Sequence, residues 1–470
     1  MNEESCQGPA EGATSSPLPT LLLTPRRSAL LAGHDNTLDV LVRVQAPDAP
    51  ADLPERQPLH LSLVIDRSGS MCGQPLEEAR RCAEFVLDGL QSTDRLSVVV
   101  YDDTVQTLVA AAPIGSAREA IRHAIRQVDS GGSTDLHAGW LEGVQTLVPH
   151  VSARSVSRVI LLSDGCANAG VCDPQAIWAQ CQEFASAGIG TSTYGLGRGF
   201  NEDLMIGMAR TGHGRSYYGE KAADLHDPFR EEFDLLNASC ARRLKLEVAA
   251  PRVGVTTRML NDYAAAEDGA WWLPDVAYAG EAWAVLRLKV PATVLTPPAA
   301  PTETGTEGHA HVVSIALRYT GTDGEPRATR PVALELPVLS AAAFAAIAED
   351  ELVVRRVGEL EAAELQLKAR QAALRGEWNT VRSLLRRAEQ LGVDNPWIAA
   401  AVGELHKLAA RRDDVMFAKQ SAYGSLRMST RLAARAESSE FDDALPAASY
   451  LRRKANPGKG VEPPTSRPRE

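Results

Sequence analysis

Three groups of oxygen-bearing side chains stand out in this sequence by their type and spacing. Asp66, Ser68 and Ser70 follow the apolar run LHLSLVI, Thr134 lies in the stretch DSGGSTDL, and Asp164 ends the run VILLS. Hard divalent cations prefer oxygen ligands, and Mg²⁺ takes few protein ligands and keeps several waters. We therefore predict a Mg²⁺ site made of these five residues, and the same oxygens would also accept Mn²⁺.

The charge of this ligand set indicates what the site would do. If the two aspartates bind through water and the direct ligands are neutral hydroxyls, the metal keeps much of its positive charge. It then attracts a carboxylate from another molecule to its open position. The alternative is that the same side chains only cap helices and close turns, and that no metal binds.

The elements around these residues are predicted to place them at one edge of a sheet. Apolar runs at 59–65, 157–163 and 190–197 alternate with helical patterns such as 75–90 and 173–188. This alternation is typical of an α/β fold with a doubly wound, mostly parallel sheet that helices cover on both faces. Ligands of such sheets bind beyond the carboxyl ends of the strands, where the strand order reverses. We therefore expect the first and third groups to lie at such strand ends.

The same five residues give the sequence a specific resemblance to a known family. Asp66-x-Ser68-x-Ser70, followed by Thr134 in a GGST loop and Asp164 in an SDG strand end, resembles the von Willebrand factor type A (VWA) domain. These residues match its metal-ion-dependent adhesion site (MIDAS). The resemblance implies Mg²⁺-dependent docking of a protein partner that offers an Asp or Glu to the metal.

The resemblance covers about residues 58–225. The rest of the chain is similar to bacterial proteins in which such a domain sits within a β-sandwich and precedes a helical tail. Those proteins resemble the calcium-activated chloride channel regulators and plant proteins that pair the domain with a ubiquitin-ligase RING. The sequence has neither a RING-type cysteine array nor a membrane-spanning run. We therefore expect neither ligase nor channel activity.

The patterns on either side of the α/β segment predict two further parts. Alternating runs after about residue 229 are typical of an antiparallel β-sandwich, and the runs after residue 340 are helical. The strand pattern at 38–45 alternates in the same way, so we expect it to pair with the sandwich and the α/β domain to be an insertion. The predicted organisation is a disordered tail at 1–18, N-terminal strands joining the sandwich at 19–57, the VWA domain at 58–228, the β-sandwich at 229–340, a helical domain at 341–440 and a disordered basic tail at 441–470.

Composition narrows the class of protein further. The chain has 470 residues and a net charge of −11, which argues against a nucleic-acid surface because phosphate binding needs a basic face. No apolar run approaches the ~20 residues of a membrane helix. The first residues lack the pattern of a signal peptide, and the scattered cysteines are typical of reduced thiols, so we expect a cytoplasmic protein. Zinc at Cys166, Cys172 and Cys181 is the weaker alternative, because their spacing fits no CxxC pattern.

We expect a cytosolic adaptor or scaffold that binds a protein partner and has neither enzymatic activity nor a small-molecule substrate. One alternative is a metal-dependent hydrolase, with Asp102, Asp103 and Asp135 near the site loops and His137 on the helix that follows. The sequence lacks the nucleophile elbow, the zinc helix and the phosphate loop, which argues against that alternative. The other alternative is a secreted adhesin.

Overall fold

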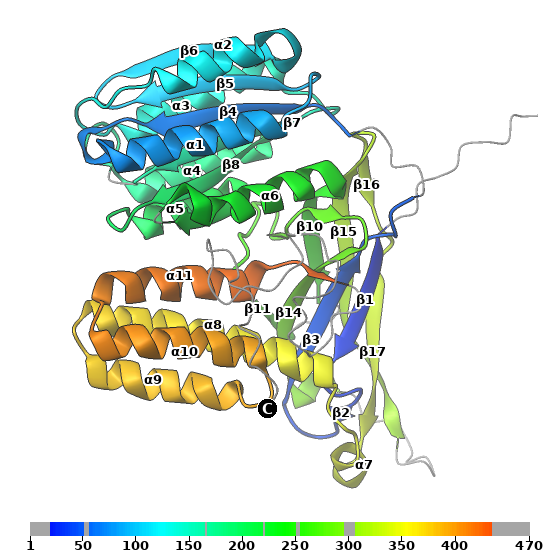
Figure 1. Cartoon of the computed structure of the whole chain (residues 1–470). Coiled ribbons are helices and arrows are strands. Elements are labelled where there is room, and N and C mark those ends of the chain that lie inside the picture. The colour runs from blue at the N-terminus through cyan, green and yellow to red at the C-terminus, as the bar shows by residue number, and fades with distance from the viewer. Residues whose placement is uncertain are drawn as a thin grey trace, which may run out of the picture.

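Three structural parts correspond to the three sequence patterns. The computed structural model contains a mostly parallel α/β domain, two antiparallel sheets and a helical region (Figure 1). The tails expected to be disordered lie outside the described residues. The structure describes residues 19–50, 56–164, 167–219, 221–250, 254–295 and 306–434.

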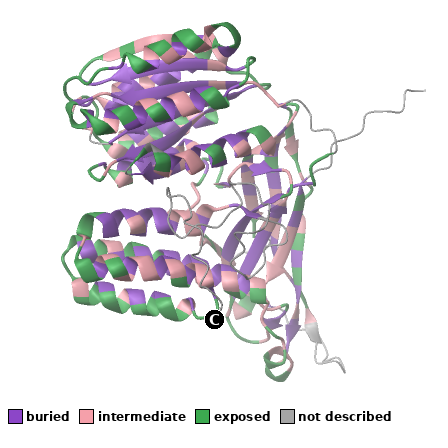
Figure 2. Cartoon of the chain, viewed as in Figure 1, coloured by how far each residue is buried: buried purple, intermediate pink, exposed green. Residues whose placement is uncertain are grey.

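The apolar runs form the strands of the α/β domain. The strand order is β6-β5-β4-β7-β8-β9, and every neighbouring pair is parallel except β5 and β6, which form a hairpin at the edge. Nearly every residue of β4, β7 and β8 is buried, because helices cover both faces of the sheet (Figure 2). The strands are β4 (Leu59–Asp66), β5 (Arg95–Tyr101), β6 (Val105–Pro113), β7 (Val156–Ser163), β8 (Ile189–Leu196) and β9 (His213–Gly219).

Helices cover the two faces of this sheet in separate sets. Residues of α1, α2 and α6 share one hydrophobic cluster with the sheet, and residues of α3, α4 and α5 share another. α4 starts as its sequence predicts, because Asp173 accepts a hydrogen bond from the Gln175 amide at 3.2 Å and Pro174 is the first helical residue. The helices are α1 (Gln74–Gly89), α2 (Ile114–Arg126), α3 (Leu136–Leu147), α4 (Pro174–Ser186), α5 (Glu202–Thr211) and α6 (Ala222–Ala238).

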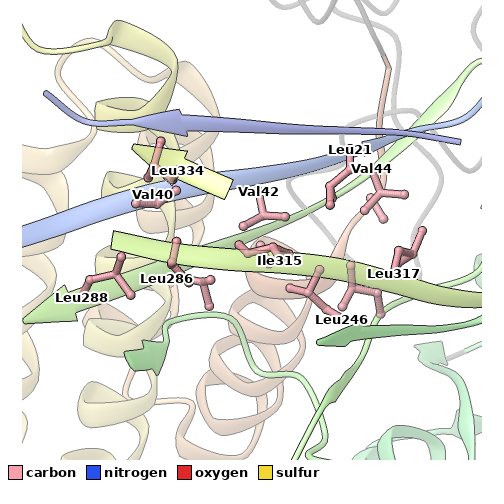
Figure 3. Packing of buried hydrophobic residues seen from close by; sticks show 14 of the residues in the cluster. Leu21, Val40, Val42, Val44, Leu246, Leu286, Leu288, Ile315, Leu317 and Leu334 are labelled. Atoms are coloured by element: carbon pink, nitrogen blue, oxygen red, sulfur yellow. The ribbon is translucent and has the colours of Figure 1, made fainter. Parts of the chain in front are cut away.

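The two other sheets, antiparallel except for the β17–β2 pair, pack face to face as a sandwich. One has the order β1-β3-β14-β11 with β18 paired to β14, and the other has the order β12-β10-β15-β17-β2 with β13 and β16 at its side. Their inner faces share one apolar core, in which Val42 and Leu286 of the first sheet meet Leu246 and Ile315 of the second (Figure 3). The strands are β1 (Thr20–Pro25), β2 (Leu30–Leu31), β3 (Asn36–Gln45), β10 (Ser239–Ala249), β11 (Thr256–Met259), β12 (Trp271–Trp272), β13 (Val276–Ala277), β14 (Gly280–Val290), β15 (Thr306–Gly321), β16 (Pro326–Ala328), β17 (Val332–Leu339) and β18 (Ala433–Ala434).

The α/β domain is inserted between strands of the sandwich. β3 precedes this domain in the chain, β14 follows it, and the two strands pair in antiparallel register from Asn36–Val290 to Gln45–Glu281. This is the pairing that the alternating pattern of β3 predicts. Both ends of the inserted domain are therefore joined to the sandwich.

The helical region follows the sandwich and packs against both other parts. α8 covers the outer face of one sheet, where Trp283 is buried beneath Arg356 with the guanidinium carbon 4.6 Å from the ring centroid. Met416 and Tyr423 of α11 join the hydrophobic cluster of the α/β domain. No described helix combines the length and the hydropathy that a membrane span requires. The helices are α7 (Ala341–Ala345), α8 (Glu351–Leu374), α9 (Trp378–Leu391), α10 (Pro396–Arg411) and α11 (Asp414–Thr430).

Candidate metal centre

The order of the strands brings the predicted site residues to one edge of the parallel sheet. β4 lies between β5 and β7. The chain continues from β4 to β5 on one side and later enters β7 on the other side, so the strand order reverses next to β4. Asp66 is the last residue of β4 and stands in register with Tyr101, the last residue of β5. Ser163 ends β7 on the other side, and Asp164 follows it. This is the switch point at which open α/β sheets bind ligands.

Hydrogen bonds hold the buried carboxylate of Asp66 in place. Its Oδ1 accepts a bond from the Ser68 amide at 2.9 Å, and its Oδ2 accepts bonds from Ser163 Oγ at 2.6 Å and Tyr101 Oη at 3.2 Å. Burial raises the pKa of Asp66, the bonds from Ser163 and Ser68 oppose that rise, and the charge of Asp164 adds to it. A nearby cation would therefore relieve the cost of keeping this carboxylate ionised.

The two serines after Asp66 present their hydroxyls side by side. Ser68 is buried and precedes the 3₁₀ turn η1 (Gly69–Met71), whereas Ser70 is exposed. Their Oγ atoms lie 3.1 Å apart. Neighbouring ligands of an octahedral Mg²⁺ with bonds of about 2.0–2.1 Å lie about 2.9 Å apart. The spacing of the two hydroxyls therefore fits adjacent positions on one such ion.

The loop that carries Thr134 is fastened to the serine loop through the backbone. The Gly69 amide donates to the Gly132 carbonyl at 2.8 Å, and the Gly131 amide donates to the Arg67 carbonyl at 2.6 Å. A Cβ atom at Gly131 would overlap the carboxylate of Asp102, so this close approach requires glycine. The first and second groups of predicted residues are thus parts of one bonded unit.

The third loop is fastened to Thr134 in turn. The Thr134 carbonyl accepts hydrogen bonds from the Asn168 and Ala169 amides, both at 3.1 Å. The Thr134 amide donates to Asn168 Oδ1 at 2.8 Å. Asp164 is buried at the start of this loop, and its charge acts on Asp66. The structure therefore brings together the loops of all five predicted residues, and metal binding by them stays a prediction.

A partly buried ion pair joins the loop after β4 to the end of β5. Arg67 Nε lies 3.1 Å from Asp102 Oδ2, and Asp102 Oδ1 accepts bonds from the Thr104 amide at 2.8 Å and the Thr104 hydroxyl at 2.7 Å. Burial alone would raise the pKa of Asp102, but the bonds from Thr104 and the charge of Arg67 more than offset it and lower the pKa. Asp102 is therefore a fixed structural anion.

Most of the other side chains proposed for hydrolysis or zinc binding have structural contacts, whereas Asp103 is exposed beside Gly132. Asp135 caps α3 by accepting from the Ala138 amide at 3.0 Å, and His137 Nε2 lies 3.0 Å from the side-chain oxygen of Gln180. Cys181 is buried in the apolar core, where burial raises its thiol pKa, and Cys172 is exposed. Cys166 lies outside the described residues. Among those described, no group of three or more His, Cys, Asp or Glu side chains could hold a metal.

The sequence did not lead us to three residues that hydrogen-bond to the predicted site residues. Tyr101, Ser163 and Asn168 all bond directly to predicted site residues. Ser163 and Tyr101 could have been predicted, since each is the last residue of an apolar strand that neighbours β4. Asn168 could not have been predicted, because its role depends on the path of a loop.

Comparison with known proteins places the α/β domain in a family. The sequence profile of the von Willebrand factor type A domain matches residues 60–231. An uncharacterized protein of Synechocystis, sll0103, is 29% identical over 200 residues, which cover 42% of this chain and 46% of that protein. Human inter-alpha-trypsin inhibitor heavy chain H3 is 31% identical over 188 residues, which cover 38% of this chain and 21% of that protein. The chain thus spans less than half the length of these relatives.

Two solved structures share more of the architecture. A von Willebrand factor type A protein from Catenulispora acidiphila superimposes with a TM-score of 0.66 over 89% of this chain and 98% of its own, at 15% identity. The ArnB paralog VWA2 from Sulfolobus acidocaldarius gives a TM-score of 0.55 over 87% of this chain and 99% of its own, at 17% identity. At these identities the likeness shows the fold alone, and it extends beyond the α/β domain.

Proposed function

Because residues 60–231 form a von Willebrand factor type A domain, we propose that this protein is an adaptor or scaffold that docks a protein partner through a divalent cation. Domains of this family typically mediate protein–protein interaction. The observation that carries the proposal is the bonded unit of three loops, in which Ser68 and Ser70 hydroxyls lie 3.1 Å apart beside the buried Asp66 carboxylate.

The proposed ligands divide by charge. The hydroxyls of Ser68, Ser70 and Thr134 would hold Mg²⁺ directly, and Asp66 and Asp164 would hold it through water. Mn²⁺ would bind to the same oxygens. When bound, the cation supplies a positive charge that neutral direct ligands leave largely uncompensated. A partner's Asp or Glu carboxylate is the group that best completes such a site.

The environment of the site favours binding over catalysis. A hydrolase needs a general base free to move a proton. Asp102 is engaged by Arg67 and Thr104, His137 by Gln180 and Asp135 by the Ala138 amide, so none of these three is placed to act as that base. Asp103 is exposed to water. We therefore propose no enzymatic activity. We place the protein in the cytosol, because the cysteines within the described residues are free thiols, as is usual in a reducing compartment.

Thr134→Val is the decisive variant for metal binding, with Thr134→Ser as its matched control. Both replacements fit a small buried position, but only serine keeps the hydroxyl. We expect Mn²⁺, followed by electron paramagnetic resonance, to bind the wild type and Thr134→Ser at least tenfold more tightly than Thr134→Val. Equal affinity in all three proteins would overturn the proposed metal site.

Partner docking is tested with the same pair of variants. Immobilised wild-type protein and Thr134→Ser should retain a partner from cell extract in Mg²⁺ and release it in EDTA, and Thr134→Val should not retain it. Neutralising the partner's contact Asp or Glu should abolish retention. If the same proteins are captured in Mg²⁺ and EDTA, docking does not use the metal.

A further inference from the structure

A cavity of about 640 Å³ lies where the α/β domain, the sandwich and α11 meet. Its walls come from the first residues of β7, β8 and β9, from β10 and β12, and from the C-terminal half of α11. Figure 1 shows α11 facing α5 and α6, with the sandwich strands beside them. The cavity is therefore at the opposite end of the parallel strands from the candidate metal centre. Its volume is typical of pockets that hold small organic ligands, about 300–1,000 Å³.

Positive charge dominates the walls of this cavity. Among the described residues that line it are seven arginines and two aspartates. The chain as a whole carries a net charge of −11, so the concentration of arginine here runs against its overall composition. Four of these arginines pair with carboxylates of the α/β domain, the sandwich or α8. The pairs are Arg158–Glu232 at 2.7 Å, Arg210–Asp262 at 2.9 Å, Arg427–Glu231 at 3.5 Å and Arg431–Glu359 at 3.0 Å.

The other three arginines, Arg215, Arg242 and Arg243, have no carboxylate within ion-pair distance among the described residues. Arg242 Nη2 donates to the side-chain oxygen of Gln57 at 2.6 Å, and Arg243 Nη2 donates to the Ser186 carbonyl at 2.6 Å. Both acceptors are neutral. Arg215 lies beside the Tyr217 hydroxyl, and the charges of Glu232 and Glu231 act on it from a longer distance. Three guanidinium groups from β9 and β10 therefore line one cavity without a carboxylate in direct contact.

One aspartate partly offsets this charge. Asp275 accepts a hydrogen bond from the Arg243 amide at 2.8 Å. The seven arginines that line the cavity face five carboxylates, those of Asp262, Asp275, Glu231, Glu232 and Glu359, which leaves an excess of two positive charges. The excess acts on His213, which also lines the cavity. Burial, and then the charges of Arg243 and Arg158, lower the pKa of His213 to about 3. Its Nε2 is buried and has no hydrogen-bond partner within the described part of the chain.

We propose that this cavity binds a small organic anion with two or more negative charges, such as a phosphate monoester or a polycarboxylate. Arg215, Arg242 and Arg243 hold the anionic group, because guanidinium forks bind phosphate and carboxylate oxygens in pairs. Aromatic side chains, including Trp272 and Tyr263, line the remaining space and contact the organic part. Because the α/β domain, the sandwich and α11 each supply walls, a bound anion joins all three parts.

The test uses the full chain in EDTA, so that the metal centre plays no role. The probes are glucose 6-phosphate, citrate, inorganic phosphate and uncharged glucose, measured by calorimetry at matched ionic strength. We expect glucose 6-phosphate or citrate to bind, glucose not to bind, and the double variant Arg242→Gln/Arg243→Gln to weaken binding at least tenfold. Arg386→Gln, an exposed arginine of α9, is the matched control and should bind as the wild type does.

The outcomes separate this inference from the proposed docking function. Anion binding that persists in Thr134→Val and is lost in the double arginine variant supports the cavity site, whatever the fate of the metal site. Which of the two organic probes binds tells a phosphate ligand from a carboxylate ligand. Binding of inorganic phosphate as tight as that of the organic anions, an unchanged affinity in the folded double variant, or no binding beyond the salt effect would each overturn the proposal.

Discussion

A buried lysine fastens the helical region to the VWA domain, and its replacement tests that joint. Lys419 of α11 has a side chain only 3% exposed, and its Nζ donates to the Phe200 carbonyl at 2.6 Å and to Glu202 Oε2 at 2.9 Å. The same Nζ lies 3.7 Å from the centroid of the Phe200 ring. Lys419→Met keeps the length of the side chain and removes these polar contacts.

The structure allows the size of the effect to be worked out. Removing one partner of a buried ion pair costs about 3–5 kcal/mol when the other charge is left alone. Glu202 is not left alone, because Arg370 Nη2 remains 2.8 Å from its Oε1. The Phe200 carbonyl does lose its charged donor, which costs about 1–3 kcal/mol. We therefore expect Lys419→Met to lower the free energy of unfolding by about 2–3 kcal/mol.

Urea unfolding followed by circular dichroism measures this loss. Lys368→Met is the matched control, because Lys368 of α8 pairs with Glu364 at 2.7 Å and both side chains are more than half exposed, at 55% and 52%. An exposed pair of this kind contributes about 0.5 kcal/mol or less. If both variants shift the unfolding midpoint equally, the buried lysine does not stabilise the joint and the reasoning is wrong.

Further predictions concern the loops of the candidate metal centre. Gly131→Ala should destabilise the protein by about 1–3 kcal/mol and weaken Mn²⁺ binding, because its Cβ would overlap Asp102, whereas Gly199→Ala, with open space around its Cβ, should leave Mn²⁺ affinity unchanged. Ser163→Ala should cost about 1.5–3 kcal/mol, because it removes the hydrogen bond to the Asp66 carboxylate, and an unchanged melting temperature would contradict this. Asp102 has a pKa below its ordinary 3.8, so its ionised form stabilises the fold at neutral pH, and this stability is lost as the pH falls through the lowered pKa. Asp102→Asn should therefore flatten the acid side of the plot of melting temperature against pH. Parallel plots for the variant and the wild type would refute this role of Asp102.

The sequence predicts those parts of the fold that depend on local pattern. The apolar runs of β4, β7 and β8 and the alternation in β3 each identify a strand, because burial on two faces or on one face fixes the spacing of apolar residues. The ends of β4 and β7 likewise place Asp66 and Asp164 at one sheet edge. This reasoning covers the elements and the candidate metal-site residues at their ends.

Features that depend on how the parts meet could not be predicted in this way. The strand pattern around Arg242 and Arg243 indicates a charged face, but only the packing of α11 and the VWA domain turns that face into a cavity wall. Asn168 holds Thr134 through a loop whose path no periodic pattern specifies. The short strand Ala433–Ala434, which pairs with β14, has too few residues to show any period.

The insertion of the VWA domain sets the order in which the chain can assemble as it is synthesised. β3 leaves the ribosome long before β14, and the Gln45 and Glu281 side chains that bond at 2.8 Å are 236 positions apart. The VWA domain is complete before β14 has been synthesised, so it can fold first. Until then β1 and β3 lack their partner strand β14, and their apolar faces stay exposed. β18 adds the last strand to the same sheet only after the helices have been made. A chain halted during synthesis between α6 and β14 therefore carries a finished VWA domain on an unfinished sandwich, and that interval is where a chaperone is most needed.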